Sequence, residues 1–182
     1  MNNRDHRKFC IIDGHTAFTG GINLADEYIN QKPRFGHWKD TAILLKGEAV
    51  WSMTVMFLTM WEYVRDVKED YDRLRPETLP AEAAGGAGYY VQPYVDNPLD
   101  EEPVGEAVYL NLINKARHYV YAMTPYLIIS DSVNTALCNA AKSGVDVRLI
   151  TPHIPDKPLV FELTRAHYIF YKIYNGEYAY IN

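Results

Sequence analysis

Six residues near the start of the chain have the chemistry needed for reactions at phosphorus. One residue separates the histidine from the lysine, four separate the lysine from the aspartate, and six separate the aspartate from a glycine pair. An imidazole can attack phosphorus as a nucleophile, and an ammonium can neutralise the non-bridging oxygens as charge develops. Glycines allow close approach of main chain to phosphate, and an asparagine amide donates one further hydrogen bond. These residues are His6, Lys8, Asp13, Gly20, Gly21 and Asn23.

The spacing of these residues is more informative than their types. A histidine and a lysine separated by one residue occur by chance in many proteins. The complete set is expected roughly once in ten thousand such stretches, from average residue usage. The stretch therefore predicts a site that binds and attacks an anionic tetrahedral centre.

Two predicted strands position this motif. Period-2 alternation over residues 6–13 places His6 and Lys8 on one face of a strand, with Arg7 and Phe9 on the other. Asp13 and the glycine after it form a turn, and residues 16–19 continue as a second strand into the glycine pair. The motif is thus expected on a β-hairpin.

The remaining sequence divides at a linker. Residues 38–45 are a third predicted strand, and the apolar periodicity of residues 48–65 predicts a helix buried between layers. Residues 66–88 combine charges, two prolines and an alanine- and glycine-rich stretch, which is typical of a surface linker. Beyond it we expect strands at 89–94, 118–123, 145–150 and 177–181, and helices at 104–117, 132–142 and 159–174.

The alternation of strands and helices predicts an α/β fold, with a largely parallel or mixed sheet flanked by helices. We expect three parts: residues 1–70 with the motif, residues 71–88 as a linker, and residues 89–182 as a second α/β part.

Composition limits the environment and the partners of the chain. The formal net charge of −5 argues against a broad nucleic-acid-binding surface, which normally carries a basic excess.

Cys10 and Cys138 each lie in an apolar stretch, so we expect two buried free thiols and a reducing compartment. No secretory leader is visible in the polar first residues. The longest uncharged apolar run, residues 49–61, is shorter than the roughly 20 residues of a membrane span, and we expect a core helix there.

The motif resembles the HxK(x)4D(x)6G(G/S)xN signature of the phospholipase D superfamily. Within that superfamily the sequence is most similar to bacterial cardiolipin synthases, and the likeness extends through FGHWKDTAILLKGEAVWSMTVMFLTMWEY, YVQPYVDNPLDEEPVGEAVYLNLINKARHYVYAMTPYLII and LCNAAKSGVDVRLITPHIPDK. It is weaker over residues 66–88 and after Phe161.

The resemblance implies an active-site histidine at His6 and phosphate binding by Lys8 and Asn23. It also implies double displacement through a phosphohistidine, in which the histidine of a second motif protonates the leaving alcohol. No metal or other cofactor is implied, because two lysines supply the positive charge. The implied substrate and acceptor are phosphatidylglycerol, an anionic phospholipid, and the products are cardiolipin and glycerol. The intact parent protein would lie at the cytoplasmic side of the cell membrane.

Two carboxylates near the motif each allow two interpretations. Asp13 precedes a glycine, which favours a turn-forming role over direct chemistry, and we keep it as a motif residue. Asp40 either orients the imidazole of His6 or lies at a solvated strand end paired with Lys39.

The other histidines do not show the spacing of a metal site. His37, next to the strand that carries Asp40, is a further candidate for the lining of the site. The remaining ones are interpreted as surface or hydrogen-bonded polar residues: His15, His118, His153 and His167.

Relatives of this kind carry two such motifs, and this sequence contains one complete motif. We therefore expect the end of one half-domain joined to the start of the next, an incomplete copy of each. Three interpretations follow. The chain is part of a cardiolipin synthase and inactive alone; it is a phosphodiesterase or nuclease formed from two single-motif chains; or it is a non-catalytic association module. The first requires a complementing half or self-association, and contact with the membrane through the rest of the parent.

Overall fold

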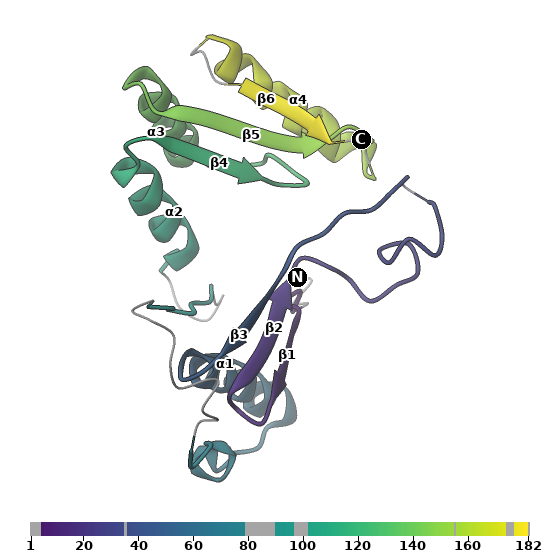
Figure 1. Cartoon of the computed structure of the whole chain (residues 1–182), viewed down its shortest axis with the longest axis vertical. Helices are drawn as coiled ribbons and strands as arrows, with labels where there is room; N and C mark the ends of the chain where they lie inside the picture. Colours follow the sequence, from purple (N-terminus) through teal and green to yellow (C-terminus); the bar gives the residue numbers. More distant parts are fainter. Residues whose placement is uncertain are drawn as a thin grey trace. The chain divides into compact units, whose positions relative to one another are not determined.

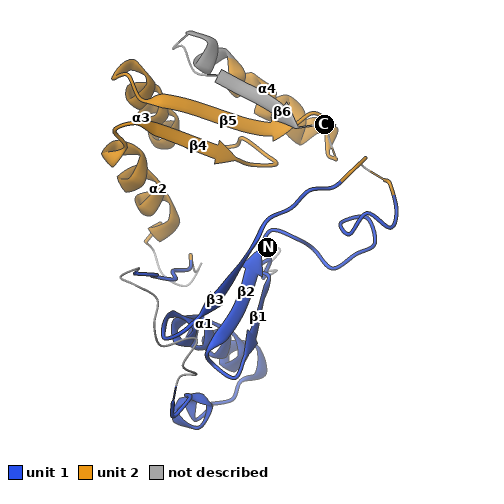
Figure 2. Cartoon of the chain, in the orientation of Figure 1, with its two compact units in different colours: residues 1–32, 38–95 blue, residues 33–37, 96–182 orange. Residues whose placement is uncertain are grey.

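Two compact units make up the chain. The computed structural model describes residues 5–34, 36–78, 90–96, 102–154, 156–173 and 177–181. One unit comprises residues 1–32 and 38–95, and the other residues 33–37 and 96–182 (Figure 2). Each unit has its own three-stranded sheet and its own hydrophobic core. The predicted α/β class is therefore confirmed.

The first unit is an antiparallel sheet with one long helix packed on it. Its strands are β1 (Phe9–Ile12), β2 (Thr16–Gly20) and β3 (Ala42–Lys46), in the order β1-β2-β3 (Figure 1). Helix α1 (Ala49–Arg65) follows β3, and a 3-10 turn, η1 (Tyr71–Leu74), comes after it. The predicted hairpin and helix are thus confirmed.

The β1–β2 hairpin closes through a turn at Asp13 and Gly14. Both residues have a positive φ, 52° and 67°, and the His15 N–H donates to the Ile12 carbonyl at 3.3 Å. Positive φ at both central residues is what a type I′ turn requires, and aspartate followed by glycine is one of its preferred pairs. A Cβ on Gly14 would also lie 3.0 Å from the Pro76 ring. The sequence of the turn therefore fixes the register of the hairpin.

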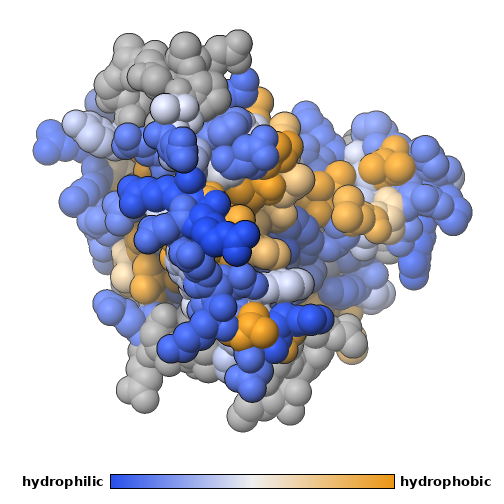
Figure 3. Space-filling model, turned by 90° about the horizontal axis from the view of Figure 1, so that it is seen from below, coloured by the Kyte–Doolittle hydropathy of each residue, from blue (hydrophilic) through white to orange (hydrophobic). Residues whose placement is uncertain are grey.

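Helix α1 covers one side of the first sheet. Val50 and Met53 of the helix are buried against Ala17 of β2. Further along the same face of the helix the cover is incomplete, because Phe57 and Trp61 are exposed to 40% or more. The expected burial between two layers is thus wrong for the described residues. Apolar patches of this kind interrupt the hydrophilic surface in Figure 3.

The second unit is a parallel sheet with three helices. Its order is β4-β5-β6, and each neighbouring pair is parallel. A helix precedes β4 and another connects each pair of strands, as predicted. The elements are α2 (Val104–Lys115), β4 (Tyr119–Met123), α3 (Asp131–Lys142), β5 (Asp146–Pro152), α4 (Pro158–Ile173) and β6 (Glu177–Ile181).

One face of the parallel sheet carries the core of the second unit. Val147 and Leu149 of β5 are buried with Ile113 of α2, Leu137 of α3 and Tyr168 of α4. All three helices therefore pack on the same face of β5. Because successive side chains of a strand point to opposite faces, the other face of this sheet carries a different set of side chains.

The opposite face of the second sheet is polar and aromatic. Tyr119 and Tyr121 are more than half exposed, and their ring centroids lie 4.7 Å apart. The Tyr121 hydroxyl donates to the Asp146 carboxylate at 2.6 Å, and the Arg148 guanidinium lies 5.2 Å from the Tyr121 ring centroid. The hydrogen bond from Arg148 lowers the pKa of Asp146, and the hydrogen bond to Asp146 raises the pKa of Tyr121. Parallel sheets usually have both faces covered, and this polar network shows how the uncovered face meets solvent.

Three predicted strands differ from the structure. Tyr90–Tyr94, the described part of the predicted strand 89–94, does not form a strand. Pro93 has no N–H to contribute to a ladder, which explains the failure of an otherwise suitable alternation. The predicted strand 6–13 begins only at Phe9, and the predicted strand 38–45 only at Ala42.

The domain boundaries at 1–70, 71–88 and 89–182 stay a prediction. Residues 79–88 lie outside the described residues, and the two compact units divide at residues 95 and 96 instead. The uncharged run 49–61 lies in α1, as predicted. Across the described parts of the chain, no helix combines the length and the apolarity that a bilayer span requires.

Two hydroxyl groups tie α4 into the second unit. The buried Thr164 hydroxyl accepts a hydrogen bond from the Leu127 N–H at 3.0 Å, and the Tyr168 and Thr151 hydroxyls lie 2.6 Å apart. The first contact joins α4 to the segment after β4, and the second joins α4 to β5. Buried polar groups of this kind are costly when their partners are removed.

Replacing Thr164 by valine should destabilise the second unit by about 1–3 kcal/mol, because the Leu127 N–H loses its acceptor. Thr135→Val on the exposed side of α3 is the control and should change stability by less than about 0.5 kcal/mol. Urea unfolding measures both. Equal stability of the two variants would contradict the assigned role of the Thr164 hydroxyl.

The two cysteines are free thiols, as predicted, but their burial differs. Cys138 in α3 is buried, and burial raises the pKa of its thiol. Cys10 is exposed, so its predicted burial is wrong. Its position explains this, because β1 alternates and Cys10 lies on the side away from α1 with Ile12.

A thiol-specific maleimide should therefore label one cysteine in the folded chain and both after unfolding. Cys10→Ser should abolish the fast reaction, since the remaining thiol is buried and its pKa is raised. Cys138→Ser should leave the fast reaction unchanged. Mass spectrometry of the labelled chain measures this, and equal rates at both thiols would refute the assignment.

Candidate active site

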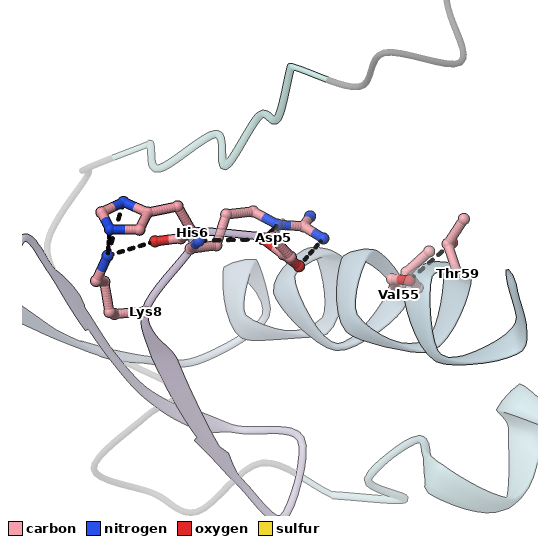
Figure 4. Close-up of polar contacts among 6 residues, drawn as sticks. Asp5, His6, Lys8, Val55 and Thr59 are labelled. Carbon is pink, nitrogen blue, oxygen red and sulfur yellow. Dashed lines mark hydrogen bonds and ion pairs between the residues drawn. The ribbon is translucent and has the colours of Figure 1, made fainter. Parts of the chain in front are cut away.

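His6 and Lys8 are in direct contact. Lys8 Nζ lies 2.8 Å from both ring nitrogens of His6 and donates a 2.6 Å hydrogen bond to the His6 carbonyl (Figure 4). An ammonium has donors only, so the ring nitrogen that carries no hydrogen is the acceptor in this contact. His6 is exposed and Lys8 is half-buried. An imidazole and an ammonium are thus adjacent, and the imidazole is open to solvent.

Two hydrogen bonds from β2 to its carbonyl hold Lys8, although it lies before the first strand. Its carbonyl accepts a hydrogen bond from the Thr19 hydroxyl at 3.0 Å and one from the Gly20 N–H at 3.4 Å. The hairpin register sets both contacts, since it pairs Thr19 with Phe9. Thr19 was not among the predicted site residues. Its position next to the glycine pair is the signal in the sequence that could have identified it.

Asp5 and Arg7 form an ion pair on either side of His6. The Asp5 carboxylate accepts from Arg7 Nε at 2.9 Å, from its terminal guanidinium nitrogen at 2.7 Å and from its backbone N–H at 3.0 Å. The hydrogen bond from the Arg7 side chain lowers the pKa of Asp5, and the same bond raises the pKa of Arg7. Both groups therefore stay ionised over a wide pH range. Neither was predicted as a site residue.

Asp13 lies at the far end of β1 from the histidine. It comes five positions after Lys8, which corresponds to on the order of 16 Å of extended chain. Its positive φ and its place in the hairpin turn account for an aspartate at this position. The structure therefore shows Asp13 in the turn-forming role and does not bring it beside His6.

Gly20 and Gly21 are required by close contacts with the segment before β3. A Cβ on Gly20 would lie 2.6 Å from the Thr41 carbonyl oxygen, and one on Gly21 would lie 2.9 Å from Asp40 Oδ1. The Gly20 N–H already donates to the Lys8 carbonyl. At Gly20 the structure thus supports a packing reason for glycine. Phosphate binding by the glycine pair stays a prediction.

Asn23 and Asp40 lie on the segments around the glycine pair. Asn23 is half-buried just beyond β2. The Asp40 carboxylate accepts from Trp38 Nε1 at 3.2 Å and from the Thr41 N–H at 2.8 Å. Within the described residues none of its hydrogen bonds reaches His6 or Lys39. Its proposed action on the imidazole stays a prediction.

The other histidines do not form a second site in the described part of the chain. His15 contacts the Thr16 hydroxyl at 2.9 Å, and His167 contacts the Leu163 carbonyl at 3.0 Å. His37 precedes Lys39 with the same bare spacing as His6 and Lys8, without the aspartate and glycines that follow in the motif. Among the described residues, no three His, Cys, Asp or Glu side chains gather where a metal ion could be held.

Comparison with known proteins supports the resemblance over nearly the whole chain. Residues 109–178 match the family described as cardiolipin synthase, PLD-like domain. A cardiolipin synthase of Geobacillus kaustophilus is 37% identical, and cardiolipin synthase 2 of Bacillus anthracis is 39% identical, each over 92% of this chain. An uncharacterized protein of Streptococcus mutans is 52% identical over the same share.

The fold and the match define the chain as phospholipase D-like. Within that class it is similar to the cardiolipin synthases, through the family match over residues 109–178 and through these relatives. The chain spans about a third of the length of the relatives it matches, 33% for the Geobacillus protein and 32% for the Bacillus protein.

The two glycines give a test of the geometry. Gly20→Ala should destabilise the first unit by about 1–3 kcal/mol, because the new methyl group meets a backbone carbonyl that must shift. Gly21→Ala should cost less, since the carboxylate it meets is the end of a flexible side chain. Urea unfolding distinguishes them, and a Gly21→Ala variant less stable than Gly20→Ala would contradict the packing.

Proposed function

We propose that the chain carries the nucleophile and phosphate-binding half of a phosphatidyl transfer site. The overall reaction converts two molecules of phosphatidylglycerol into cardiolipin and glycerol. The contact between His6 and Lys8, at 2.8 Å within the complete motif, is the observation that carries this proposal. The similarity to cardiolipin synthases of Geobacillus and Bacillus supports the choice of reaction.

Binding of the phosphodiester changes the partner of Lys8. In the structure its ammonium lies 2.8 Å from the ring nitrogens of His6 and occupies the one that accepts. A non-bridging phosphate oxygen is anionic and accepts more strongly than a neutral ring nitrogen. Lys8 therefore turns its donors to the phosphate, and this frees a lone pair on His6 for attack.

The first displacement forms the bond between the His6 nitrogen and phosphorus and breaks the bond between phosphorus and the glycerol oxygen. Lys8 stabilises the charge on the non-bridging oxygens. The departing glycerol oxygen takes a proton from a general acid. In the second displacement, the hydroxyl of another phosphatidylglycerol gives its proton to the conjugate base of that acid and attacks phosphorus. This breaks the bond to nitrogen and releases cardiolipin.

The general acid is the part of the reaction that we propose to come from outside this chain. The resemblance implies a histidine in a second motif, and this sequence has one complete motif. We therefore propose a complementing half or a second copy as the partner, and a membrane surface as the source of lipid. Turnover by this chain alone is not expected.

A phosphatidyl diester of p-nitrophenol tests the nucleophile separately from the missing acid, because nitrophenolate leaves without protonation. The chain should release about one equivalent of nitrophenolate and retain the phosphatidyl group on His6 in acid-labile, base-stable linkage. His6→Ala should abolish the burst, and Lys8→Ala should slow it about a hundredfold through loss of charge stabilisation. Stopped-flow absorbance and mass spectrometry measure both.

His118→Ala is the matched control, since His118 is also exposed but lies outside the motif. It should give the wild-type burst. With phosphatidylglycerol itself, the chain should form no cardiolipin. Turnover to cardiolipin that is lost in His6→Ala would contradict the need for a partner, and a burst that persists in His6→Ala would refute the nucleophile. Cleavage of nucleic-acid diesters would favour the alternative of a dimeric phosphodiesterase.

A further inference from the structure

The residues flanking His6 lie on the opposite side of the chain from the imidazole. We infer that Asp5 and Arg7 are positioning residues, which hold the imidazole of His6 toward Lys8. For its catalytic consequence this inference rests on the proposed function. Its structural content concerns only the order and direction of the His6 side chain, so the two can be tested separately.

The ion pair closes a ring around His6. The Asp5 carboxylate binds the Arg7 side chain through two nitrogens and also its backbone N–H at 3.0 Å. These contacts fix the backbone on both sides of the intervening residue. His6 itself lies before β1 and has no place in the strand ladder. The ion pair therefore restrains the backbone at His6, where the sheet does not.

Aromatic contacts connect the ion pair of Asp5 and Arg7 to α1. The Arg7 guanidinium lies 5.6 Å from the ring centroid of Phe9, and Phe9 packs edge-to-face on Phe57 at 6.3 Å. Phe57 in turn stacks on Trp61 at 6.0 Å. Arg7 and Asp5 help line a shallow cavity of about 140 Å³ with these rings. The odd-numbered residues of this stretch thus bind the helix.

The even-numbered residues are left free for chemistry. Figure 4 shows the His6 ring and the Lys8 ammonium together, with the Asp5 carboxylate turned toward α1. Because a carboxylate and a guanidinium form a two-pronged planar contact, the pair restricts rotation more than a single hydrogen bond does. Residue 6 is then pre-ordered for attack, and ordering of this kind contributes to rate through orientation.

Nuclear magnetic resonance tests the structural content without any substrate. In the wild-type chain we expect a nuclear Overhauser effect between the His6 ring and the Lys8 ε-methylene, and a backbone order parameter of about 0.85 at His6. Asp5→Asn and Arg7→Ala should remove this nuclear Overhauser effect and lower the order parameter at His6 below about 0.6. Arg7→Lys, which keeps the charge but loses the fork, should fall between. Unchanged values in Arg7→Ala would overturn the inference.

Arg65→Ala is the matched control, because the Arg65 guanidinium also stacks on an aromatic ring of α1, at 5.4 Å from Trp61. It should leave the His6 signals at their wild-type values. Loss of the His6 order in this variant would show that any disturbance of the aromatic cluster has the same effect, and would overturn the specific role of the ion pair.

The activated diester provides the second readout. Asp5→Asn and Arg7→Ala should slow capture on His6 by about tenfold to a hundredfold, with binding of the diester little changed. If the wild-type chain shows no capture while the variants lose His6 order, the proposed function fails and the positioning role stands. If capture is the same in wild type and Arg7→Ala, the positioning role fails and the proposed function stands.

Discussion

The register of the β1–β2 hairpin is the constraint on which the candidate site depends. The turn at Asp13 and Gly14 sets this register, and the register brings Thr19 and Gly20 against the Lys8 carbonyl. A shift of one residue would turn every side chain of β1 to the other face. It would also carry the chain before β1, with its histidine, away from these donors. The aspartate of the motif thus acts on the histidine from a distance, through the geometry of the hairpin.

The two units differ in the size of their hydrophobic cores and in the elements that form them. The first unit has a small core between one sheet face and α1, and its aromatic cluster of Phe9, Phe57 and Trp61 extends toward solvent. The second unit places three helices on one sheet face and forms a larger core there. Its other face is stabilised by tyrosine rings and by the ion pair of Asp146 and Arg148.

Local patterns predicted the elements of the chain better than their surroundings. Helix α1 and the alternating elements of the second unit follow from periodicity, because their buried faces repeat in the sequence. The burial of Cys10 could not be predicted, since which face of β1 meets the helix depends on packing between segments distant in the sequence. Pro93 shows that one missing N–H outweighs an otherwise suitable alternation.

The candidate site was predictable in its residue types and only partly in its geometry. The proximity of His6 and Lys8 follows from their spacing, although the expected strand begins later, at Phe9. The contacts that hold them, from Thr19 and from the pair of Asp5 and Arg7, depend on the hairpin and on α1. A linear motif does not encode such contacts. The packing role of Gly20 likewise appears only when the segment before β3 is in place.

The exposed thiol of Cys10 has a practical consequence for studies of lipid engagement. It lies two residues after Lys8, on the side of β1 away from α1. A polarity-sensitive fluorophore attached there would sit beside the motif without altering any residue of it. Its emission would report the arrival of an acyl chain or a headgroup in real time, and the chain already carries this attachment point.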